Sequence, residues 1–227
     1  MKRFMYTTYC AVAFVLFGMT TLVVNLFLPN LRRRRQVAGV TSRAFLKVAR
    51  IPLKVLGLDQ LPASPCVVVA NHSSYIDAVV AVAALPPDFA FVIKKEMVKV
   101  PLAGLLLRRV GSEFVERFDR HKGASDVRRV LKLAASGQSL VFFPEGTFDH
   151  TRQIGRFLGG AFTTAARASM PVVTVAIHGT RDVLPPGTAW MHRRPICFEI
   201  LKVLGADEAR ESSRALIAAA LGEPLAP

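Results

Sequence analysis

The stretch that decides the fold is Cys66-Val67-Val68-Val69-Ala70-Asn71-His72-Ser73-Ser74-Tyr75-Ile76-Asp77. Its first five residues are apolar and mostly β-branched, which is typical of a buried β-strand. A polar segment follows at once, so the strand leads His72 into a loop, with Asp77 five residues further on. Histidine accepts a proton near neutral pH, and a neighbouring carboxylate fixes its tautomer and stabilises the imidazolium. The stretch therefore predicts a strand that ends in a catalytic base.

The spacing of His72 and Asp77 also has a plainer explanation. Positions five apart on a continuous helix are rotated by roughly 140°, so the two side chains meet only if the chain turns before a helix begins. Otherwise His72 is a loop or capping residue, and Asp77 is an acid in the first turn of a helix, where the helix dipole favours it. For an isolated pair this second explanation is the more common one.

Strand patterns and helix patterns alternate along the chain from Leu61 onward. The candidate strands are 66–70, 89–93, 113–115, 140–143, 172–177 and 196–203. The candidate helices are 77–84, 97–109, 125–136, 158–169 and 207–221. This alternation predicts an α/β fold, with a largely parallel central sheet covered by helices.

Polar residues stand where the candidate strands end. Besides His72 and Asp77 they include Lys94, Lys95, Glu96, Glu116, Arg117 and the run Pro144-Glu145-Gly146-Thr147. Ligands of open α/β sheets bind at the carboxyl ends of the strands, so we expect these groups to share one crevice that suits an anionic substrate. Arg117 is expected to hold a phosphate through its planar guanidinium, with Lys95 as a further cation and backbone N–H groups near Gly146 and Thr147 as donors. Taken singly, each is more often a solvated charge or a turn residue.

Composition limits the kind of partner. The 227 residues are 52% hydrophobic, enough for one catalytic-size domain and an additional segment. Thirty Lys and Arg against sixteen Asp and Glu give a net charge of +14, which favours an anionic membrane surface, a phosphorylated substrate, an acidic carrier protein or nucleic acid. The three cysteines, Cys10, Cys66 and Cys197, lie far apart, so we expect neither a disulfide framework nor a metal site.

An apolar segment precedes the α/β pattern. Residues 4–28 carry no charge, and as a helix they span about 37 Å against a hydrocarbon core of about 30 Å. We expect residues 1–35 to form an uncleaved membrane anchor with a basic flank. The four arginines 32–35 place the following domain on the cytoplasmic side, which we expect to be that of a bacterial inner membrane. A helix that lies in the membrane interface is the alternative.

A second segment, residues 36–60, precedes the predicted catalytic domain at 61–227. Within it, apolar and basic residues interleave over 41–58, which predicts a basic amphipathic helix kinked near Pro52. On anionic lipid, each basic residue near the surface contributes about 1 kcal/mol. A helix packed on the core with a solvated basic face has the same pattern.

Four blocks of this sequence match a known family in order and spacing. They are Asn71-His72-Ser73-Ser74-Tyr75-Ile76-Asp77, Gly111-Ser112-Glu113-Phe114-Val115-Glu116-Arg117, Phe143-Pro144-Glu145-Gly146-Thr147 and Met170-Pro171-Val172-Val173-Thr174-Val175-Ala176-Ile177. Over roughly 61–203 the chain resembles the 1-acyl-glycerol-3-phosphate acyltransferases, which acylate lysophosphatidic acid. The resemblance implies transfer from acyl-CoA or acyl-carrier protein to the hydroxyl of a lysophospholipid by a membrane-attached domain, with no cofactor. It places the base on His72, its partner on Asp77, phosphate recognition on Arg117 and the Gly146 turn, and acceptor positioning around Glu145.

Two departures from the family pattern concern the acceptor. Family members commonly carry arginine directly after the Phe-Pro-Glu-Gly-Thr block, whereas Phe148 stands here and the nearest arginine is Arg152. The fourth block has Thr174 where proline is frequent. We interpret Phe148 as a variation that leaves the chemistry intact but changes the expectation for the acceptor. Lyso-ornithine lipid or another lysophospholipid is therefore an alternative acceptor to lysophosphatidic acid.

Two other function classes stay open. One is a catalytically silent membrane protein that binds nucleic acid or anionic lipid, and the other is a lipase-like hydrolase. The chain has no G-x-S-x-G elbow, which argues against a serine lipase. Few aromatic residues are interleaved with the basic clusters, so we expect no nucleic-acid partner.

Overall fold

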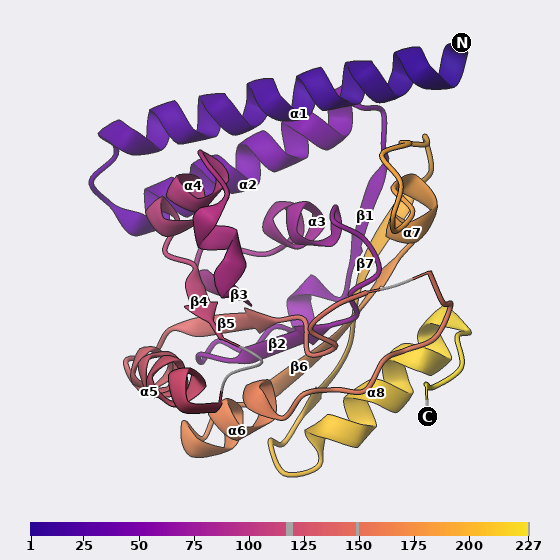
Figure 1. Ribbon diagram of the computed structural model, residues 1–227. Coiled ribbons are helices and arrows are strands. Elements are labelled where there is room, and N and C mark those ends of the chain that lie inside the picture. Colours follow the sequence, from indigo (N-terminus) through magenta and orange to yellow (C-terminus); the bar gives the residue numbers. More distant parts are fainter. Residues whose placement is uncertain (117–119, 149, 227) are drawn as a thin grey trace.

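A seven-stranded sheet forms the centre of the protein (Figure 1). The computed structural model describes residues 1–116, 120–148 and 150–226, and for 120–124 only the backbone. The strands are β1 (Leu53–Leu56), β2 (Val67–Ala70), β3 (Phe89–Lys94), β4 (Glu113–Val115), β5 (Ser139–Phe142), β6 (Val172–His178) and β7 (Ile196–Leu204). Their order is β1-β7-β6-β2-β5-β3-β4, and β6 with β7 is the antiparallel pair among otherwise parallel neighbours. The predicted largely parallel sheet is confirmed.

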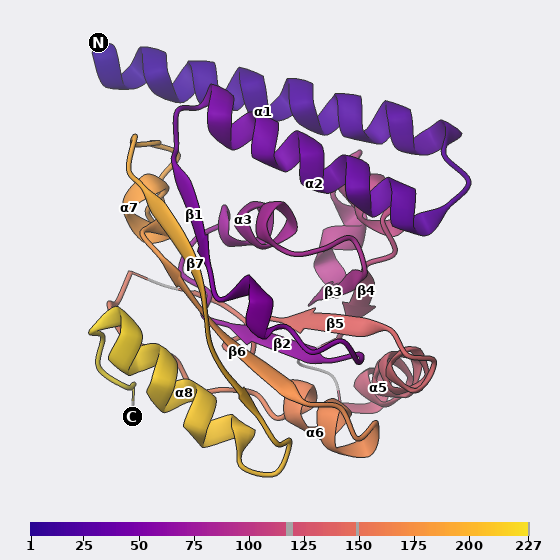
Figure 2. The same cartoon turned by 180° about the vertical axis from the view of Figure 1, so that it is seen from behind.

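Helices cover both faces of this sheet (Figures 1 and 2). The layer on one face contains α1 (Lys2–Phe27), α2 (Leu31–Val48) and α3 (Asp77–Ala84), with α3 next to the sheet. The layer on the other face contains α5 (Arg120–Ala135), α6 (Gly160–Arg167) and α8 (Ala209–Leu221). The remaining pieces are α4 (Ala103–Arg109), α7 (Thr180–Val183) and two short 3₁₀ helices, Leu58–Gln60 and Lys95–Lys99.

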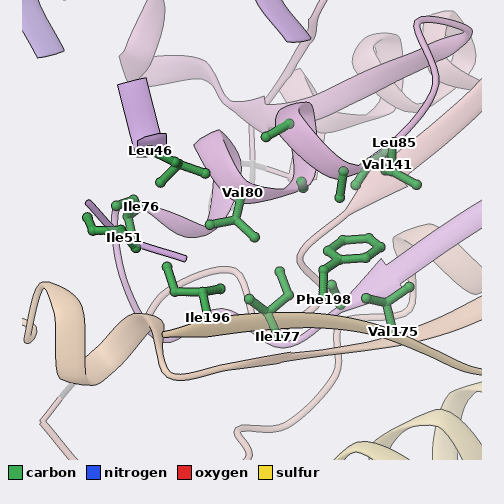
Figure 3. Packing of buried hydrophobic residues seen from close by; sticks show 14 of the residues in the cluster. Leu46, Ile51, Ile76, Val80, Leu85, Val141, Val175, Ile177, Ile196 and Phe198 are labelled. Atoms are coloured by element: carbon green, nitrogen blue, oxygen red, sulfur yellow. The ribbon is translucent and has the colours of Figure 1, made fainter. Parts of the chain in front are cut away.

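Strand β2 is buried on both faces, which explains why its sequence is a continuous apolar run. Val67 and Val69 pack with α5, α6 and α8, whereas Val68 and Ala70 pack with α1, α2 and α3. Figure 3 shows part of this second cluster, where Val80 of α3 lies above side chains of the sheet. Because β2 is central and tightly packed, the loop that follows it starts from a rigid support.

The helix predicted over 41–58 ends early. Helix α2 is basic and amphipathic as predicted, but it stops at Val48, and Arg50 adopts a left-handed conformation with φ of 55°. Pro52 has no N–H to continue a helix, and its carbonyl instead accepts the Ile196 N–H at 2.8 Å. Leu53–Leu56 then pairs in parallel with β7 as an edge strand. The helical prediction is therefore wrong for the residues after Val48.

The helix predicted over 97–109 is divided in two. A 3₁₀ helix covers Lys95–Lys99, and α4 begins only at Ala103. Between them lie Pro101, which has no N–H to donate, and Leu102, whose φ is 60°. The break leaves the apolar side chains of Val100, Leu102 and Leu105 exposed, and α4 contacts α1.

Helices α1 and α2 lie side by side and are tied together along their length (Figures 1 and 2). At one end the Tyr6 hydroxyl donates to the Ala49 carbonyl at 2.8 Å. In the middle Thr21 Oγ1 lies 2.7 Å from Thr41 Oγ1. Helix α1 is long and apolar enough to cross a membrane by length and composition. Many of its large apolar side chains point outward, including Phe4, Met5, Val12, Val15, Leu16, Leu26 and Phe27.

Helices α1 and α2 form a hairpin, and arginines bind the carboxyl ends of the helices around it. Arg109 Nη2 donates to the Asn25 and Leu26 carbonyls of α1, both at 2.7 Å. Arg35 Nε donates to the Val110 carbonyl at the end of α4, and Arg43 Nη1 donates to the Ala83 carbonyl of α3. The last carbonyls of a helix have no partner within the helix and carry a partial negative charge, so these arginines satisfy and neutralise the helix ends.

Candidate active site

The loop 71–76 connects β2 to α3 at the carboxyl edge of the central strands (Figure 1). Asn71 fixes its start, because the side-chain amide donates to the Ile177 carbonyl at 3.0 Å and accepts from the Ile177 N–H at 2.7 Å. Further along, the Ser74 hydroxyl donates to the Leu184 carbonyl at 2.7 Å. The loop is therefore anchored to β6 and to the segment after α7, and it turns before α3 begins.

The turn brings His72 and Asp77 together. His72 Nδ1 lies 2.9 Å from Asp77 Oδ2. The same oxygen accepts the Ser73 and Ser74 N–H groups at 2.7 and 2.8 Å, and Asp77 is fully buried. Three donors on one oxygen, together with the position in the first turn of α3, favour the carboxylate. A carboxylate on Nδ1 selects the tautomer that leaves Nε2 unprotonated, so His72 is arranged as a general base.

Glu145 joins this loop to the segment around Gly155. Its Oε1 accepts the His72 N–H at 2.7 Å, and its Oε2 accepts the Gly155 N–H, also at 2.7 Å. Burial raises the pKa of Glu145, and the two backbone donors oppose that rise. A Cβ on residue 155 would lie 2.9 Å from Oε2, so the close approach requires glycine there. Glu145 thus holds the backbone at His72, and its proposed part in acceptor positioning stays a prediction.

The Gly146 turn follows directly. Gly146 has a φ of 77°, which favours glycine, and its N–H donates to the Phe143 carbonyl at 3.0 Å. The Gly146 N–H is therefore bonded within the turn, and the next residue, Thr147, is exposed. Phosphate recognition by this turn remains a prediction.

Aromatic rings surround the imidazole. Phe143 stacks on the His72 ring with centroids 4.6 Å apart and an interplanar angle of 25°. Phe148 meets the same ring edge to face at 4.5 Å and 78°. Tyr75 contacts Phe148 in turn, at 4.8 Å and 80°. With 19% of its side chain exposed, His72 retains only limited access to solvent.

Lys95 lies in a second polar cluster, at the ends of β3 and β4. Its Nζ is 3.9 Å from Asp126 Oδ2, and that buried carboxylate also accepts the Glu116 N–H at 2.9 Å. Arg129 completes the cluster by donating to Asp126 and to Glu113. The predicted phosphate ligand Arg117 lies outside the described residues, directly after Glu116.

An apolar groove lies beside the His72 loop. It has a volume of about 330 Å³ and runs between α1 and the loop, with Phe14, Phe45, Tyr75 and Val79 among its lining residues. A second cavity of about 240 Å³ lies behind the Glu145 turn and is lined in part by Phe143 and Pro144. Within residues 1–116, 120–148 and 150–226, no three His, Cys, Asp or Glu side chains are grouped as metal ligands.

A comparison with known families identifies the family to which the chain belongs. A family model described as Acyltransferase matches residues 52–178, which include His72, Asp77 and Glu145. The chain belongs to the acyltransferase family. This confirms the family resemblance drawn from the four sequence blocks, and the matched span starts at the turn before β1 and ends with β6.

Curated relatives of this acyltransferase-family chain are named for two different acceptors. A chloroplastic 1-acyl-sn-glycerol-3-phosphate acyltransferase of Brassica napus is 31% identical over 162 residues, which are 69% of this chain and 47% of the relative. A lyso-ornithine lipid O-acyltransferase of Pseudomonas aeruginosa is 33% identical over 145 residues, 62% of this chain and 54% of the relative. The chain thus spans about half the length of these relatives.

A solved structure shares the whole fold. The crystal structure of a 1-acyl-sn-glycerophosphate acyltransferase from Thermotoga maritima superposes with a TM-score of 0.78 at 19% identity. The match covers 97% of this chain and 93% of that one. It therefore supports the α/β class and extends over the N-terminal hairpin as well as the sheet.

Several features of the site were not foreseen from the sequence. Asn71 stands in the first block without a predicted role, and no sequence pattern marks Gly155. Neither position carries a local pattern that reveals a hydrogen bond to a residue distant in sequence. Phe148 did carry a signal, because it stands where the family commonly has arginine.

Proposed function

We propose that this protein is a membrane-bound O-acyltransferase that moves a fatty acyl group from an acyl thioester to the free hydroxyl of lysophosphatidic acid, giving phosphatidic acid. The observation that carries the proposal is the buried carboxylate on His72 Nδ1, which leaves Nε2 as the base. Four family blocks and relatives of this activity support the same reaction.

The chemistry proceeds by direct transfer. His72 Nε2 takes the proton of the acceptor hydroxyl as that oxygen attacks the thioester carbonyl. The tetrahedral intermediate collapses with cleavage of the carbon–sulfur bond, and the imidazolium returns its proton to the leaving thiolate. Asp77 holds the ring and stabilises its charged form throughout, and positioned general-base catalysis of this kind contributes about 10² to 10⁴ in rate.

The substrates follow from the surroundings of the base. The donor is acyl-CoA or acyl-carrier protein, both anionic, which suits the net charge of +14. Lys95, which follows β3, and Arg117 are proposed to recognise the acceptor phosphate. The groove between α1 and the His72 loop offers apolar room for a lipid chain.

Association with the membrane is proposed to involve the apolar side of α1. Arg109 and Arg34 hold the carboxyl end of α1 to the domain, and the Arg3–His192 contact of 2.9 Å holds the amino end. A helix fixed along its whole length beside α2 favours insertion into one leaflet, the interfacial alternative, with basic residues of α2 at anionic headgroups. The domain then faces the cytoplasm of a bacterial cell.

A second acceptor is supported by one observation. The lyso-ornithine lipid relative is 33% identical over 145 residues, and Phe148 replaces a positive charge that is common in the family. Loss of a cation next to the base suits an acceptor with a less anionic headgroup. Lyso-ornithine lipid is therefore the second candidate.

The test is an acceptor panel. The protein in vesicles is given labelled acyl-CoA or acyl-carrier protein with lysophosphatidic acid, lyso-ornithine lipid, other lysophospholipids or glycerol-3-phosphate. Transfer to lysophosphatidic acid at the highest rate supports the proposal, and preference for lyso-ornithine lipid moves the assignment to the second candidate. No transfer to any acceptor by folded, vesicle-bound protein contradicts the enzymatic function.

A further inference from the structure

The His72 ring is covered by two aromatic side chains from the connection between β5 and α6. Phe143 and Phe148 both contact the imidazole, at centroid distances of 4.6 and 4.5 Å. On the remaining side Nδ1 is bound to Asp77. Only 19% of the His72 side chain is exposed to solvent. Bulk water therefore has a narrow approach to Nε2.

Phe148 is itself covered, by Tyr75. The two rings meet edge to face at 4.8 Å, and Tyr75 is 66% exposed. Tyr75 also lines the apolar groove that Phe14 of α1 and Phe45 of α2 border. A row of aromatic rings thus runs from the groove to the base, with Tyr75 outermost and Phe148 between Tyr75 and His72.

The chemistry of the site makes such a cover important. The same base that activates an acceptor hydroxyl also activates water. Water attack on the thioester carbonyl breaks the same carbon–sulfur bond, releases the thiol and yields a free fatty acid. The two reactions differ only in the nucleophile, so the site must keep water away from His72 Nε2 without excluding the lipid hydroxyl. An apolar aromatic cover suits a lipid and excludes water.

We propose that Phe148 and Tyr75 form an aromatic cover over His72 that excludes water, so that the acyl group is transferred to the lipid and not hydrolysed. The inference rests on the proposed acyl transfer and adds two residues that determine its selectivity. Phe148 and Tyr75 act through the surroundings of His72 and take no part in proton transfer. A dry environment also strengthens the His72–Asp77 interaction once the imidazolium forms.

The experiment measures how the acyl thioester partitions between transfer to the lipid and hydrolysis. Protein in vesicles receives labelled acyl-CoA and the preferred acceptor, and both the acylated lipid and the free fatty acid are counted. In Phe148→Ala we expect the ratio of hydrolysis to transfer to rise about tenfold, which corresponds to about 1.4 kcal/mol between the two barriers. Phe148→Leu, which keeps apolar volume, gives a smaller rise, Tyr75→Ala gives an intermediate one, and Tyr75→Phe keeps the wild-type ratio.

Phe162 supplies the matched control. It is a buried phenylalanine that stacks on Phe157 in the core on the other face of the sheet. Phe162→Ala removes the same atoms and destabilises the protein, but the ratio of hydrolysis to transfer stays as in the wild type. A rise in this variant equal to that of Phe148→Ala overturns the inference, because general loosening of the fold then explains the change.

A second readout is independent of turnover. Diethyl pyrocarbonate modifies unprotonated imidazole nitrogens that solvent reaches, and peptide mass mapping identifies the modified histidine. We expect His72 to be modified several-fold faster in Phe148→Ala than in the wild type, with a smaller increase in Phe148→Leu and with His178 unchanged. If the wild type transfers the acyl group but the Phe148 variants change neither the ratio nor the rate of His72 modification, the aromatic cover is overturned and the proposed function is not. A wild-type protein that never transfers overturns the proposed function too.

Discussion

The edge of the sheet around His72 and the α1–α2 hairpin use charged side chains in opposite ways. At the edge, the carboxylates of the buried Asp77 and the partly buried Glu145 accept backbone N–H groups, and Asp77 in addition holds an imidazole. In the hairpin, Arg34 and Arg43 donate to backbone carbonyls at helix ends. Both sets of side chains fix loops and helix termini. At the edge, however, the contacts also leave His72 Nε2 able to accept a proton. Loss of charge should therefore stop the reaction at the edge and loosen the structure in the hairpin.

The largest effect is expected at Asp77. Asp77→Asn removes the carboxylate that selects the His72 tautomer, so acyl transfer should fall by about 10² to 10⁴. Initial rates in vesicles measure the loss, and vesicle flotation should show unchanged membrane binding.

Glu199 gives the matched control for Asp77. It pairs with His178 at 3.0 Å in the same kind of histidine–carboxylate contact, but it is partly exposed. Glu199→Gln should leave the rate close to that of the wild type. An Asp77→Asn enzyme that keeps most of its activity would remove the distinction between the edge and the rest of the molecule.

The next largest effect is expected at Arg109. Arg109→Met keeps the apolar stem but leaves the Asn25 and Leu26 carbonyls without their donor, which costs about 1 to 3 kcal/mol when such groups are buried. Urea unfolding measures this loss in stability, and faster protease cleavage near residues 28–30 should accompany it.

Arg33 is the control for Arg109. Its side chain is exposed and makes no hydrogen bond or ion pair within the described part of the chain. Arg33→Met should leave both stability and cleavage unchanged. Equal effects of the two substitutions would mean that the arginines of this region act only through their total charge.

A pH-dependent effect is expected at Glu145. Burial raises its pKa in the folded protein, so the folded state holds this proton more tightly than the unfolded state. The contribution of Glu145 to stability is therefore full below the unfolded pKa and declines as the pH rises through the folded pKa. The difference in unfolding free energy between wild type and Glu145→Gln should fall over that window. A difference that grows with pH would contradict the assigned shift.

The smallest effect is expected at Arg32. Its ion pair with Asp88, at 2.8 Å, is exposed on both sides. Exposed pairs contribute about 0 to 1 kcal/mol, so Arg32→Ala should change the unfolding free energy by less than Arg109→Met. A larger loss would place Arg32 among the structural arginines of the hairpin.

Much of the fold follows from local sequence patterns. The valine run of β2 and the alternation after it predict a parallel sheet, because a strand buried on both faces must be apolar throughout. The edge strand β1 was missed, since its four residues also fit a basic amphipathic helix. What decides between the two is Pro52 and the pairing with Ile196, and a contact with a residue so distant in sequence leaves no local pattern.

The site was predictable in its residue types but not in all its contacts. His72 and Asp77 meet as predicted because the loop turns before α3. The bonds of Glu145 to His72 and Gly155 depend on how the β2–α3 loop packs against the connection between β5 and α6, which spacing does not encode. The arginines 32–35 illustrate the same limit, because the sequence gives their charge but not the carbonyls that Arg34 and Arg35 bind.

The most direct test of the central claim compares two histidines. His72→Ala and His178→Ala are assayed in vesicles for transfer from a labelled acyl thioester to lysophosphatidic acid, with flotation to confirm membrane binding. The base assignment predicts that transfer is lost in His72→Ala and retained in His178→Ala, and that both proteins bind the vesicles. Full transfer by His72→Ala would contradict the assignment of the base.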